Sequence, residues 1–102
     1  MNAKKIQKMV NKLSSPTQTL FYTALPCTKR FAKQHNLSEN WAMQAAWNQT
    51  RIVIEELILK NGMVKTDKPN HFFTAIPVSG IDDDVVKVIL DYANMKHLDY
   101  IN

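Results

Sequence analysis

Nucleophilic and metal-binding side chains are few in this sequence of 102 residues. The single cysteine, Cys27, and the histidines at 35, 71 and 97 do not follow the spacing of a zinc site. Cys27 and His35 could act as nucleophile and base only with a third group that orients the base, and no pattern supplies one. The run Asp82-Asp83-Asp84 lacks the alternating ligands of a calcium loop and is typical of an acidic helix N-terminus. We therefore predict no enzyme activity, no metal and no cofactor.

Charge is the next feature that could support a function, and it is distributed unevenly. The net charge is +4, but the first 38 residues carry seven basic side chains and no acidic one, whereas residues 81–102 carry more acid than base. The seven are Lys4, Lys5, Lys8, Lys12, Lys29, Arg30 and Lys33. This region could contact the phosphates of a nucleic acid, could dock on an acidic protein surface, or could simply be a solvated helix face.

The size and composition of the chain limit the class of protein. A chain of 102 residues with 45% hydrophobic residues fits one domain, spanning 1–102, with its own core. No apolar run approaches the ~20 residues of a membrane span, no signal-peptide pattern follows the basic N-terminus, and one cysteine allows no internal disulfide. We predict a cytoplasmic protein with no membrane association and no small-molecule substrate.

The elements that must position these side chains are mostly helices. Residues 39–61 contain no proline or glycine, and Gly62 follows where a C-terminal cap belongs. Most of the surface of this segment is apolar, apart from a narrow polar stripe, so we expect a long central helix. Shorter helices are expected over 3–13, 16–25, 29–35 and 82–97, with Pro26 ending the second, Ser15 capping its start and Thr28 capping the third.

A β-hairpin is expected after the central helix, over residues 63–76, with its turn at Asp67–Asn70. The predicted fold is therefore mainly α, with about five helices around the 39–61 helix and one hairpin.

The segment 28–51 matches a helix-turn-helix pattern. Phe31 and Ala32 supply an apolar residue and then a small one where two helices must cross closely. Asn36 tolerates the left-handed conformation that the turn requires, Leu37 follows as the apolar contact, and Ser38 can cap the second helix. Exposed Asn, Gln and Arg side chains of that second helix could read base edges in the major groove.

With the hairpin added, residues 20–80 resemble a winged helix-turn-helix DNA-binding domain. The resemblance implies a small DNA-binding regulatory protein whose hairpin is the wing and whose basic N-terminal region adds phosphate contacts. The contact residues that it implies are Lys29, Arg30, Lys33, Asn40, Gln44, Asn48, Arg51, Lys65 and Lys68. The central helix is, however, longer than the usual recognition helix.

A second hypothesis is a small protein-protein interaction module, such as an inhibitor or adaptor that acts by covering a partner's surface. Trp41 and Trp47 are six residues apart and so lie on different sides of their helix. If one of them is exposed, it becomes a candidate anchor, because tryptophan is enriched at binding hot spots. Phe72 and Phe73 point to opposite faces of the predicted hairpin, so a protein partner or a homodimer could cover one of them.

Overall fold

The computed structural model describes residues 2–60 and 82–94, and these residues form four α-helices. The helices are α1 (Ala3–Asn11), α2 (Ser15–Gln34), α3 (Glu39–Lys60) and α4 (Asp83–Asn94). The described part contains no strand, which confirms the mainly α prediction for these residues. The predicted hairpin at 63–76, with Lys65 and Lys68, lies outside the described residues. No helix in residues 2–60 and 82–94 is long and apolar enough to cross a membrane.

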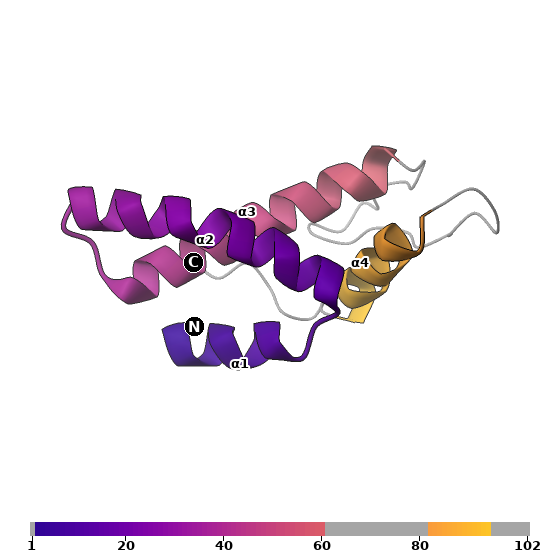
Figure 1. Cartoon of the computed structure of the whole chain (residues 1–102), viewed down its shortest axis with the longest axis horizontal. Coiled ribbons are helices and arrows are strands. Elements are labelled where there is room, and N and C mark those ends of the chain that lie inside the picture. The colour runs from indigo at the N-terminus through magenta and orange to yellow at the C-terminus, as the bar shows by residue number, and fades with distance from the viewer. Residues whose placement is uncertain (1, 61–81, 95–102) are drawn as a thin grey trace, which may run out of the picture.

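The pair α2–α3 is the centre of the fold and makes its most extensive interhelical contact. The two helices run in opposite directions and pack against each other (Figure 1). The prediction of a long central helix is confirmed, since α3 runs from Glu39 to Lys60.

Two separate clusters of buried side chains hold the other helices against this pair. In the first, Ile6 and Val10 of α1 pack with Phe21 of α2 and Trp47 of α3. In the second, α4 packs against the later part of α3; its members are Ile54, Ile58, Val88, Ile89 and Tyr92. Figure 1 shows α1 and α4 beside different stretches of the pair, so each half of α3 has its own covering helix.

One helix occupies the region where we expected two. The structure has α2 continuous from Ser15 to Gln34 with Pro26 inside it, so the prediction that Pro26 ends a helix is wrong. Proline removes one hydrogen bond and disfavours helical geometry at the preceding residue, Leu25. Leu25 is nevertheless buried in the first cluster, and Pro26 itself is exposed. Tertiary packing of Leu25 therefore outweighs the local preference against helix.

The start of α2 also differs from the prediction. The N-cap is Ser14 rather than Ser15, and it is held by a residue from the far end of the described chain. Oδ2 of Asp91 on α4 accepts three hydrogen bonds, from the Ser14 N–H at 3.0 Å, from Ser14 Oγ at 2.5 Å and from Thr17 Oγ1 at 2.6 Å. A carboxylate at this position also faces the positive end of the helix dipole. Asp91 thus joins α4 to the start of α2.

Candidate functional site

A sharp turn fixes how α2 leads into α3. Asn36 has a positive φ of 54°, which confirms the predicted left-handed turn residue. The Leu37 N–H donates to the Ala32 carbonyl at 2.7 Å and the Asn36 N–H to the Lys33 carbonyl at 3.4 Å, which is the Schellman pattern. Ser38 Oγ then accepts from the Trp41 N–H at 3.0 Å, so the predicted cap of the second helix is confirmed.

A side-chain hydrogen bond holds the two helices together near this turn. Thr28, which we expected to cap a separate helix, lies within α2 instead, so that prediction is wrong. Its Oγ1 donates to the Leu25 carbonyl at 3.1 Å and lies 2.8 Å from the Ala42 carbonyl of α3. Ala32 and Ala42 are buried beside this contact, and their small size permits the close approach.

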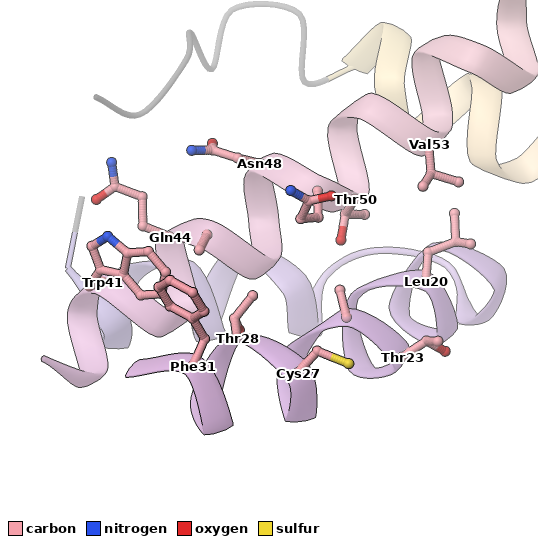
Figure 2. A pocket seen from close by; sticks show the side chains of 13 residues that line it. Leu20, Thr23, Cys27, Thr28, Phe31, Trp41, Gln44, Asn48, Thr50 and Val53 are labelled. Atoms are coloured by element: carbon pink, nitrogen blue, oxygen red, sulfur yellow. The ribbon is translucent and has the colours of Figure 1, made fainter. Parts of the chain in front are cut away.

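On one side of the pair, the two helices leave an open hollow of about 1010 Å³, which we call the α2–α3 groove. Six residues of α2 line it: Leu20, Thr23, Ala24, Cys27, Thr28 and Phe31. Seven residues of α3 complete it: Trp41, Gln44, Ala45, Asn48, Gln49, Thr50 and Val53. Figure 2 shows side chains from both helices facing this hollow, and none of the described residues that line it is charged.

An aromatic stack closes one end of the groove. The rings of Phe31 and Trp41 are stacked, with centroids 5.4 Å apart and planes 22° apart. The ring centroid of His35 lies 4.1 Å from that of Phe31. Phe31 is 46% exposed and Trp41 is 38% exposed, whereas Trp47 is only 1% exposed. The two tryptophans therefore differ in burial, with Trp41 at the surface and Trp47 in the core.

Cys27 lies in the wall of the groove and is exposed. Nη2 of Arg30 approaches its Sγ at 3.4 Å, which places a positive charge beside Cys27, between the aromatic stack and the other end of the groove wall. Within residues 2–60 and 82–94, no three His, Cys, Asp or Glu side chains lie close enough together to hold a metal ion.

The structure separates the residues predicted to contact DNA. Lys29 and Lys33 line a second, smaller hollow of about 420 Å³ with Ala32, Ser38 and Glu39 among its other residues. Gln44 and Asn48 are partly buried in the α2–α3 groove. Arg30 is exposed beside that groove, and Asn40 is exposed but accepts a hydrogen bond from the Ala3 N–H at 2.9 Å. These residues belong to different parts of the surface.

Arg51 does not reach the surface, because only 4% of it is exposed. It lies near Tyr92 of α4, whose hydroxyl donates to Oε1 of Glu55 at 3.1 Å. Burial, together with the charge and hydrogen bond of Glu55, raises the pKa of Tyr92 to about 12, and Arg51 opposes this shift. Arg51 thus belongs to a polar cluster between α3 and α4.

Sequence reasoning did not find the groove. The sequence makes Trp41 a candidate anchor only if it is exposed, and the helix-turn-helix pattern predicts Phe31 where the two helices cross, whereas the structure leaves Phe31 exposed. The other wall residues, such as Leu20, Ala45 and Val53, carry no signal that separates them from core positions.

Comparison of the chain with family models, with curated proteins and with solved structures finds no match.

Proposed function

We propose that this chain is a non-enzymatic protein-interaction module that binds an apolar segment of a partner in the α2–α3 groove. One observation carries the proposal: the groove is open, its described lining is uncharged, and it ends at an exposed stack of Phe31 and Trp41. Exposed aromatic residues beside a concave apolar surface are the usual anchors of protein interfaces.

The shape of the groove agrees with this function better than with a small ligand. Pockets for small molecules enclose most of their ligand within about 300–1000 Å³. The α2–α3 groove is as large as the upper end of that range, and its lining extends along both helices. A surface of this form is typical of grooves that receive an extended or helical segment of a partner.

The experiment is selection of random peptides displayed on phage, followed by binding measurements with two matched variants. Val53→Arg places a charge in the groove, and Leu90→Arg adds the same charge at an exposed aliphatic residue of α4. We expect selected peptides to lose at least tenfold in affinity for Val53→Arg and to bind Leu90→Arg as they bind the natural chain. Circular dichroism of each variant checks that the helices are retained.

Equal loss in both variants, or no loss in either, would contradict the proposal. A library that yields no peptide specific for the chain would also count against it. Alkylation of Cys27 gives a second readout, since it is the one cysteine of the chain and lies in the groove wall. A bound peptide should slow its reaction with a maleimide.

DNA binding is a second candidate, because all seven basic residues of the first 38 are exposed. The turn at Asn36 and the cap at Ser38 also have the geometry that a helix-turn-helix requires. In this proposal the predicted hairpin would be the wing of a winged helix-turn-helix, with Lys65 and Lys68 near phosphates. The burial of Arg51 removes one of its expected base contacts.

A salt titration of duplex binding tests this second candidate. We expect a log–log slope of roughly −3 to −5 if that many phosphates are contacted. The double variant Arg30→Ala/Lys33→Ala should weaken binding, whereas Val53→Arg should not. Absence of duplex binding at about 50 mM salt would exclude the DNA proposal and leave the groove proposal untouched.

A further inference from the structure

The two ends of the α2–α3 groove are apolar. The Phe31–Trp41 stack closes one end, and Leu20 and Val53 lie at the other (Figure 2). Along α3 the lining from Trp41 to Val53 corresponds to about 18 Å. Cys27 of the α2 wall lies between the two ends (Figure 2). A segment bound along the groove would therefore pass Cys27 on its way from one apolar end to the other.

A single guanidinium lies beside this middle stretch. Nη2 of Arg30 approaches Sγ of Cys27 at 3.4 Å, and Arg30 itself is exposed. A thiol sulfur is only a weak acceptor, so most of the N–H donors of this guanidinium remain for a stronger one. Among residues 2–60 and 82–94, no carboxylate pairs with Arg30. The middle of the groove thus carries a positive charge that the described part of the chain does not neutralise.

Neither helix of the groove can supply the missing carboxylate along its lining. The helix α2 contains no acidic residue, and α3 contains none from Asn40 to Ile54. The acidic residues of α3 nearest to this stretch have other positions. Glu39 lines the second hollow, and Oε1 of Glu55 accepts the hydroxyl of Tyr92. A carboxylate for Arg30 is therefore expected from a bound molecule.

This charge also distinguishes between two kinds of protein partner. In a dimer with two-fold symmetry the same surface of each copy faces the other. Two grooves packed in this way would bring both Arg30 side chains to the middle of one interface, where like charges repel. A different protein that carries an acidic side chain avoids this repulsion.

We infer that the groove binds a partner segment in which an acidic side chain, placed between two apolar anchors, pairs with Arg30. This inference rests on the proposed function and adds the chemistry of the bound segment. The anchors would pack on the Phe31–Trp41 stack and beside Val53, at the two ends of the lining. A guanidinium can hold a carboxylate by two parallel hydrogen bonds, which adds geometric specificity to the charge.

The test uses peptides that the natural chain selects from the random phage library. Each selected peptide is also made with its acidic residues replaced by the corresponding amides. Both forms are measured against the natural chain, Arg30→Gln and Lys29→Gln. Lys29 is the matched control, because it is exposed, adjacent in sequence and lines the second hollow, and its replacement removes the same charge.

We expect the selected peptides to carry Asp or Glu between two large apolar residues. The amide form should bind the natural chain about three- to tenfold more weakly than the acidic form. Arg30→Gln should lose the same factor for the acidic form and should not discriminate between the two forms, whereas Lys29→Gln should behave as the natural chain does. The discrimination should diminish at high salt.

Other outcomes separate the inference from the proposed function. Peptide binding that Val53→Arg abolishes, but that Arg30→Gln leaves unchanged, would overturn the acidic partner and leave the proposed function standing. Equal losses in Arg30→Gln and Lys29→Gln would do the same, because they would show only an effect of net charge. So would duplex binding that Arg30→Gln weakens while peptide binding is unchanged, since it would assign Arg30 to phosphates.

Two outcomes would overturn both proposals. One is a library that yields no peptide specific for the chain. The other is self-association in sedimentation velocity that Val53→Arg abolishes, because it would assign the groove to a second copy of this chain.

Discussion

The two sides of the α2–α3 pair differ in what covers them, although both are rich in apolar residues. On one side, α1 and α4 bury Trp47, Ile54 and Ile58 in two clusters. On the other side, Trp41 and Val53 remain more than a third exposed in the groove. Exposed apolar patches on small proteins often mark interaction sites, so we propose that a partner binds this side, which neither α1 nor α4 covers. The covered side supplies the stability that keeps the two helices in place.

Replacing each tryptophan by alanine in turn is the strongest test of this difference in burial between the two sides. Trp47→Ala removes the largest fully buried side chain of the described residues, and we expect a loss of about 3–5 kcal/mol in the free energy of unfolding. Trp41→Ala removes an exposed ring stacked on Phe31, and we expect a loss of about 1 kcal/mol or less. Urea unfolding followed by circular dichroism measures both. Similar losses in the two variants would show that the groove side is covered after all.

The polar cluster on the covered side predicts a dependence on alkaline pH. The pKa of Tyr92 is raised to about 12 from an ordinary value of 10, first by burial and then by Glu55. The folded chain therefore holds this proton more tightly than the unfolded chain, and the stabilisation is present in full below pH 10. It is lost as the pH rises from 10 to 12, by about 2–3 kcal/mol at most.

Urea unfolding at pH 9 and at pH 11 measures this loss, with Tyr92→Phe as the control. The control lacks the titrating hydroxyl, so its stability should fall less over the same interval. An absorbance titration near 295 nm should show a phenol that ionises near pH 12 in the natural chain and is missing in Tyr92→Phe. Equal losses of stability in the two proteins would contradict the role assigned to Tyr92.

A third test concerns the carboxylate that joins α4 to α2. Asp91→Ala removes the acceptor of three hydrogen bonds and leaves the hydroxyl of the fully buried Thr17 without this partner. We expect a loss of about 2 kcal/mol in the free energy of unfolding. Asp83→Ala is the control, since Asp83 is an exposed acidic residue of the same helix. Its effect should stay within about 0.5 kcal/mol.

Sequence alone could predict the features that depend on local chemistry. The length of α3 follows from the absence of proline and glycine over 39–60, and the turn follows from Asn36 and Ser38, each of which acts within a few residues. Features that depend on distant residues could not be predicted. Ser14 is hydrogen-bonded to Asp91, and Arg51 lies beside Tyr92. Asp91 and Tyr92 are both on α4, far away in the sequence.

The groove escaped prediction for a related reason. An apolar residue such as Ala45 or Val53 looks the same in sequence whether a neighbouring helix covers it or not. Among the described helices, α1 and α4 lie against the other side of the pair and leave this side without a covering helix. The candidate site is thus defined by where the short helices pack, and their packing positions are not encoded in the residues of the groove itself.

Pro26 provides the smallest test, because it lies on exposed surface of α2 and its removal should stabilise the chain. Proline cannot donate a hydrogen bond to the carbonyl of residue 22, and in a helix interior it is about 3 kcal/mol less favourable than alanine. The helix already accommodates Pro26, so we expect Pro26→Ala to recover only about 1 kcal/mol, measured by urea unfolding. Ala24→Pro, two residues earlier in the groove wall, should instead destabilise the chain. If Pro26→Ala also destabilises it, the proline sets a bend in α2 that the packing of Leu25 requires, and the groove wall depends on that bend.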